Sequence, residues 1–183
     1  MTKFLRRFAF FMLILMQFAF LLSIFFDKMN APLVLLFLGI ISVLISVAYF
    51  KAPREQERYF IKDLYLILFA VTGAMSTFFI NIELKLGPVI AAGLIGCLAS
   101  FVPSINRKSK LLKEVPPAVY CGVFVGMTSA SVAPNLKFIL LAGFIAGSIL
   151  MLSKNIFNGF GGKLGTIAFG SIAISSIILY TLF

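Results

Sequence analysis

Residues 8–26 read FAFFMLILMQFAFLLSIFF, an apolar run without a charged side chain that follows a basic segment at residues 3–7. About 20 consecutive apolar residues suffice for a helix to cross the hydrocarbon core of a bilayer. No small-residue cleavage site follows the run, because residues 25–27 are Phe-Phe-Asp. The pattern therefore predicts a retained first transmembrane helix rather than a cleaved signal peptide.

The composition of the whole chain excludes an ordinary water-soluble fold. Of the 183 residues 61% are hydrophobic and 12% are charged, against roughly 25% charged residues in soluble domains. Apolar runs bounded by charge or proline predict an all-α polytopic integral membrane protein with a single transmembrane domain, residues 1–183. Because the fourth to sixth runs are short, six crossings with a re-entrant segment are the alternative to seven. The seven expected helices lie near residues 8–26, 32–50, 64–82, 88–104, 117–133, 137–153 and 164–183.

Basic residues indicate the orientation of these helices. With a cytoplasmic N-terminus, 13 of the 16 Lys and Arg residues fall on the cytoplasmic side, as the positive-inside rule requires. The expected location is the inner membrane of a bacterium, with anionic lipid headgroups as the partner of the cytoplasmic loops. A cytoplasmic protein is a second partner class, whereas short basic loops do not favour nucleic acid. The headgroup or partner candidates are Arg107, Lys108, Lys110 and Lys113.

The chain divides into two parts of different composition. Residues 1–82 are rich in Phe and are expected to face lipid, whereas residues 83–183 are rich in Gly and Pro and are expected to pack tightly. Two GxxxG pairs, at 122/126 and 143/147, predict close helix packing, within one chain or in a homo-oligomer. Lys-Leu-Gly opens the fourth helix at 85–87 and the seventh at 163–165. This match predicts a 3+3 inverted repeat after one extra helix, with chance similarity as the alternative.

Two segments carry candidate functional residues. Glycines around a lysine at the start of the seventh helix favour an anion, because backbone N–H groups and the helix N-terminus add positive charge; the alternative is a connector whose lysine contacts lipid phosphate. Hydroxyl groups near the fifth helix are expected either to line a path or to bond helix carbonyls. The candidates for binding a solute or anion are Gly161, Gly162, Lys163, Gly165, Thr166, Tyr120, Thr128 and Ser129, together with Lys85 at the opposite end of the expected path.

The absent residue types restrict the function. The chain has no His and only two Cys, which excludes His-dependent nucleophilic catalysis and predicts neither a metal site nor a cofactor. No expected span carries a carboxylate near its middle, so an intramembrane proton relay is not expected. The sequence favours a non-enzymatic channel or facilitator for a small anionic or neutral solute. The alternative is a non-catalytic sensor, a defence or immunity factor, or a subunit that recruits a partner.

Overall fold

The computed structural model describes residues 3–51, 61–154, 156 and 162–182, and all regular structure in these ranges is helical. A 3₁₀ turn, η1 (Ile61–Leu64), precedes α3, and a π-helical turn, η2 (Phe79–Glu83), extends it. The α-helices are α1 (Lys3–Asp27), α2 (Pro32–Lys51), α3 (Tyr65–Phe78), α4 (Pro88–Ile105), α5 (Lys110–Gly126), α6 (Leu136–Leu152) and α7 (Lys163–Leu182).

Side chains and backbone conformation fix where the helices of the second part begin. Pro88 occupies the first turn of α4 after Gly87, whose φ of 83° is readily adopted only by glycine. The Ser109 hydroxyl accepts a hydrogen bond from the Leu112 N–H at 3.4 Å, and the Asn135 amide oxygen accepts one from the Phe138 N–H at 2.9 Å. These two N-caps set the starts of α5 and α6.

Helix α5 begins earlier than the sequence pattern predicted. Apolar runs bounded by charge or proline predict a fifth span at 117–133, whereas α5 runs from Lys110 to Gly126 with Pro116 and Pro117 inside it. Proline is tolerated inside membrane helices when neighbouring groups satisfy the freed carbonyls. As a result, residues 127–135 form the non-helical connection to α6 rather than the end of a helix.

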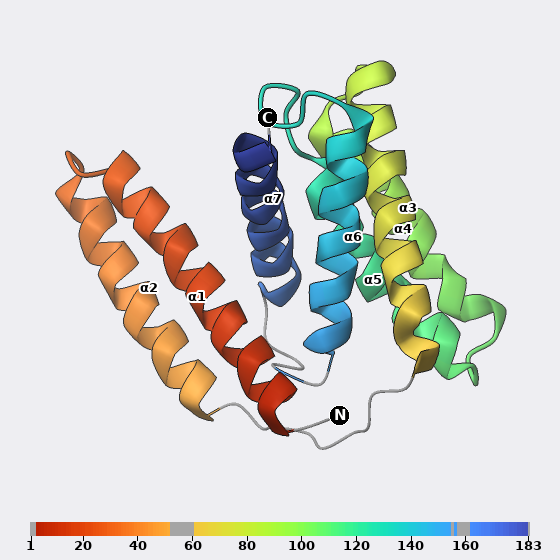
Figure 1. Ribbon diagram of the computed structural model, residues 1–183, viewed down its shortest axis with the longest axis horizontal. Coiled ribbons are helices and arrows are strands. Elements are labelled where there is room, and N and C mark those ends of the chain that lie inside the picture. The colour runs from red at the N-terminus through yellow and green to blue at the C-terminus, as the bar shows by residue number, and fades with distance from the viewer. Residues whose placement is uncertain (1–2, 52–60, 155, 157–161, 183) are drawn as a thin grey trace.

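Helix α3 is the centre of the packed bundle. It packs mainly against α5 and α6, while α4 packs on α5, and α7 packs on α5 and α6 (Figure 1). The α1–α2 hairpin stands to one side and joins the bundle mainly through contacts of α1 with α7 (Figure 1). The small residues Ala70, Gly73 and Ala74 of α3 are buried between its neighbours, whereas Leu68 on the same helix is exposed. That residues 1–82 face lipid stays a prediction.

Both GxxxG pairs are used for packing within the chain. A Cβ atom added to Gly122 would lie 1.8 Å from the Ala70 carbonyl oxygen, and one on Gly126 would lie 2.5 Å from that of Ala74. On α6, Gly143 and Gly147 likewise face α3. Helices α5 and α6 thus approach the α3 backbone at distances that only glycine permits.

The two units of the expected inverted repeat pack differently. Helices α5, α6 and α7 all contact one another, whereas α2 lies against α1, apart from α3 and α4 (Figure 1). The packing gives the repeat no support, and it stays a prediction.

Basic helix ends gather at one end of the molecule. The starts of α1, α3, α5 and α7 and the ends of α2, α4 and α6 all lie at the bottom of Figure 1, which we call the basic end. Lys28, Lys85 and Lys137 lie at the opposite end. Four described stretches are long and apolar enough to cross a membrane by length and composition: Arg7–Asp27, Tyr65–Glu83, Pro88–Ile105 and Lys163–Thr181.

Candidate functional site: an ion-pair cluster at the basic end

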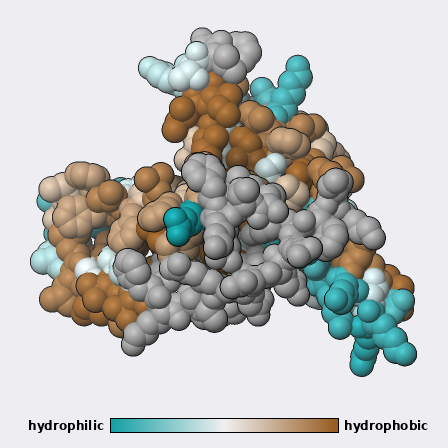
Figure 2. All heavy atoms as spheres, turned by 60° about the horizontal axis from the view of Figure 1, so that its bottom comes forward, coloured by the Kyte–Doolittle hydropathy of each residue, from teal (hydrophilic) through white to brown (hydrophobic). Residues whose placement is uncertain are grey.

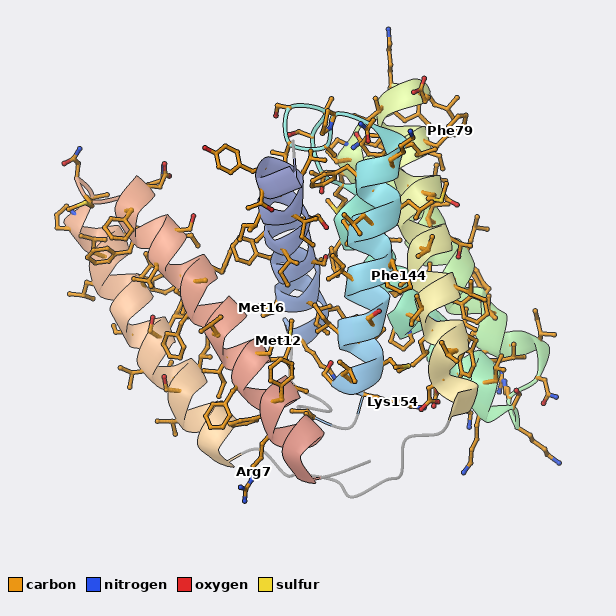
Figure 3. All side chains as sticks on the ribbon, in the orientation of Figure 1. Arg7, Met12, Met16, Phe79, Phe144 and Lys154 are labelled. Atoms are coloured by element: carbon orange, nitrogen blue, oxygen red, sulfur yellow. The ribbon has the colours of Figure 1, made fainter. Side chains whose placement is uncertain are left out.

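Three charged side chains from distant parts of the sequence meet at the basic end. The Lys154 ammonium lies 3.0 Å from Asp63 Oδ1 and 2.6 Å from Glu114 Oε1. The Tyr65 hydroxyl donates a hydrogen bond to the other oxygen of Glu114. Asp63 precedes α3, Glu114 belongs to α5 and Lys154 follows α6, so the cluster ties together three helix ends. Figure 3 shows Lys154 beneath α6, next to the start of α3.

The cluster is largely shielded from solvent. The exposed fractions of the side chains are 10% for Asp63, 23% for Lys154 and 27% for Glu114. Burial alone lowers the pKa of Lys154, but the hydrogen bonds and charges of Glu114 and Asp63 outweigh it, so that the pKa is raised above 10.5. Lys154 is therefore charged at physiological pH, and removing it would leave two poorly solvated carboxylates without a counter-charge.

Lys163 stabilises the neighbouring end of α6. Its ammonium donates hydrogen bonds to the carbonyl oxygens of Ser153 at 2.6 Å and Lys154 at 3.2 Å. A cation is favourable there because the last carbonyls of a helix carry partial negative charge. Together with the ion pairs of Lys154, this contact brings the start of α7 to the same cluster.

The other candidates of the Gly-rich segment have separate partners. The Thr166 hydroxyl donates to Gln17 Oε1 at 2.5 Å, which joins α7 to α1, and lies 3.2 Å from the Gly162 carbonyl oxygen. Gly162 has a φ of 86°, whereas nothing lies within 4 Å of a Cβ placed on Gly165. Gly161 lies outside the described residues.

The remaining candidates are not part of the cluster. The Tyr120 ring packs against Gly96, where an added Cβ would lie 2.7 Å from Cε1. The Thr128 hydroxyl donates to the Val125 carbonyl oxygen at 2.6 Å, and Ser129 is exposed in the same connection. Lys85 is exposed at the opposite end. The predicted residues therefore form separate groups rather than one site.

Buried serines of α7 bond within their own helix. Ser171 donates to the Ala168 carbonyl oxygen and Ser175 to that of Ser171, both at 2.8 Å. Their side chains are fully buried on the face of α7 that packs into the bundle. Both hydroxyls are thus hydrogen-bonded inside the bundle.

A second polar group lies near the opposite end, where α3 changes to π-helical geometry. The Asn81 amide nitrogen donates to the Gly126 carbonyl oxygen at 3.4 Å, at the end of α5. The fully buried Thr77 hydroxyl has no hydrogen-bond partner among the described residues. Single π-turns inside α-helices are frequent at functional sites.

Basic residues also form an exposed patch between α4 and α5. Figure 2 turns the basic end toward the viewer and shows hydrophilic residues in several patches, the largest at the lower right, on the side of the α4–α5 connection. The patch consists of the exposed side chains of Arg107, Lys108, Lys110 and Lys113.

Sequence reasoning did not find the ion-pair cluster. Asp63, Glu114 and Lys154 each lie next to an apolar run, but nothing in the sequence pairs residues so far apart. The only available signal was that all three were expected on the cytoplasmic side.

Comparison with known proteins adds no assignment. No protein-family model matches the chain, and no curated protein or solved structure matches it significantly.

Proposed function

We propose that this protein is a small transport protein, a channel or facilitator, for a small anionic or neutral solute. The observation that supports it is the largely buried Asp63–Lys154–Glu114 cluster at the ends of α3, α5 and α6. Charged groups that are shielded from solvent are costly unless they are paired, and ionisable groups that face the interior of a helix bundle commonly mark the paths of solutes or ions. Helix packing alone would not require such a cluster.

The path is expected along the inner face of α7. The interface of α3 with α5 and α6 leaves no room for a solute, because the glycines there touch the α3 backbone. Helix α7, which packs on α5 and α6, instead carries the buried hydroxyls of Ser171 and Ser175. In this proposal the described arrangement is closed at the basic end, where the ion pairs hold the helix ends together.

Lysines at the basic end favour an anion over a cation. Lys154 and Lys163 are both partly buried there, and Arg107, Lys108, Lys110 and Lys113 are exposed at the same end. In the closed arrangement the carboxylates of Asp63 and Glu114 form ion pairs with the Lys154 ammonium. Removing their charge would open the basic end and leave Lys154 free to attract an anion.

Flux in proteoliposomes tests this proposal. The panel comprises chloride, nitrate, acetate, glycerol and urea, with protein-free liposomes as the blank. We expect the double variant Asp63→Asn/Glu114→Gln to raise anion flux severalfold, whereas Lys137→Gln at the opposite end leaves it unchanged. Equal flux in both variants would refute the gate, and the absence of flux for the whole panel would count against transport.

A non-catalytic membrane subunit, sensor or defence factor is the second candidate. The observation that favours it is the tight glycine packing around α3, which is also what a purely structural bundle would have. Under this alternative the exposed basic residues recruit a cytoplasmic partner. Co-purification of a stoichiometric protein that is lost when Arg107, Lys108, Lys110 and Lys113 are neutralised, with no solute flux, would support it.

Neither candidate function assigns an enzymatic activity or a cofactor to the chain. A homo-oligomer in a bacterial inner membrane remains part of the proposal, although both GxxxG pairs are already used inside one chain. An oligomer would therefore need another surface, and the outer faces of α1 and α2 carry exposed large apolar side chains.

A further inference from the structure

The α4–α5 connection joins an apolar helix face directly to a group of positive charges. On α4, Leu98, Phe101 and Ile105 project from one face, with exposed fractions of 65%, 64% and 80%. Arg107 and Lys108 follow at once, and Lys110 and Lys113 occupy the first turns of α5. Along this surface the chain changes from apolar to basic in the order in which a bilayer changes from acyl chains to headgroups.

No acidic side chain neutralises this group of charges. The nearest one in sequence, Glu114, is turned inward to Lys154 and Tyr65. None of the four basic residues takes part in an ion pair within the part of the chain that the structure describes. Lys110 and Lys113 also lie at a helix N-terminus, where the backbone adds positive rather than negative charge.

We propose that the α4–α5 connection is a binding site for anionic phospholipid. Arg107, Lys108, Lys110 and Lys113 hold the phosphate of the headgroup, while Phe101 and Ile105 lie beside its acyl chains. A bilayer fits better than an acidic protein, because the basic residues continue the exposed apolar face of α4. This inference is independent of transport, since it concerns the outer surface of the molecule.

Lipid binding to the purified protein tests the proposal without any flux measurement. Native mass spectrometry of the full chain in detergent counts bound phosphatidylglycerol against phosphatidylcholine of the same acyl chains. Each basic residue near anionic lipid contributes roughly a fivefold gain in affinity. Because two basic residues are removed, we expect Lys108→Gln/Lys110→Gln to lower the preference for phosphatidylglycerol roughly 25-fold.

The charge-matched control is Lys85→Gln/Lys137→Gln at the opposite end. All four substituted side chains are exposed, so both double variants are expected to fold. An undiminished preference in Lys108→Gln/Lys110→Gln, or an equal loss in the control, would overturn the site. Binding of a polyglutamate peptide without any preference for phosphatidylglycerol would also overturn it, in favour of an acidic protein partner.

Discussion

At the scale of single residues, Gly122 has the closest approach to a neighbouring backbone among the glycines that the structure describes. An added Cβ would lie 1.8 Å from a backbone oxygen of α3, so the helices must separate to accept any side chain. We expect Gly122→Ala to destabilise the fold by about 3 kcal/mol, the upper part of the usual range for overpacking. Thermal unfolding in detergent, followed by circular dichroism, measures the effect as a lower melting temperature.

The matched control for this prediction is Gly93→Ala on α4. Nothing lies within 4 Å of a Cβ at Gly93, which is exposed in the middle of its helix. Alanine loses less backbone freedom in a helix than glycine does, by roughly 0.5–1 kcal/mol. This variant should therefore melt no lower than the parent chain, and similar melting of the two variants would contradict the packing assigned to Gly122.

At the scale of helices, the pattern of apolar residues predicts which helices exist better than it predicts where each one begins and ends. Lengths and bounding charges placed α1, α2, α4, α6 and α7 close to their observed ranges, because in such a chain the apolar run is itself the helix. The predicted start of α5 was wrong. The Ser109 N-cap and the acceptance of two prolines inside the helix both depend on neighbouring structure. For the candidate site, Lys163 and Thr166 do bond nearby groups, but these partners come from α6 and α1, which local sequence does not reveal.

The contact between α1 and α7 yields a prediction at the same scale. Gln17 and Thr166 share a hydrogen bond, and Met16 packs against Gly170 on the face of α1 that Figure 3 shows toward α7. In a variant whose own Cys97 and Cys121 are replaced by Ala, Gln17→Cys/Thr166→Cys should be cross-linked by a short bifunctional thiol reagent. Leu15 is 71% exposed on the same helix, so Leu15→Cys/Thr166→Cys should not. Equal cross-linking of the two variants would contradict the described orientation of α1 against α7.

At the scale of the whole molecule, the distribution of charge orders the fold. Successive helices alternate in direction, which brings residues as distant as Arg7 and Lys154 to one end (Figure 3). The expected positive-inside pattern and the observed geometry agree on which helix ends belong together. Because the two derive from different observations, loop charge and helix packing, their agreement makes a sided arrangement in a membrane directly testable.

Labelling from the two faces of a membrane tests that arrangement. In the background without native cysteines, Lys108→Cys and Lys85→Cys place single thiols at the exposed basic and opposite ends. An impermeant maleimide should modify Lys108→Cys only from the cytoplasmic side and Lys85→Cys only from the other, because basic loops are retained in the cytoplasm. Lys28→Cys, on the α1–α2 connection, should behave like Lys85→Cys. If the Lys108 and Lys85 variants were labelled from the same face, α4 would not cross the membrane. The assignment of the ion-pair cluster to the cytoplasmic side would then be contradicted as well.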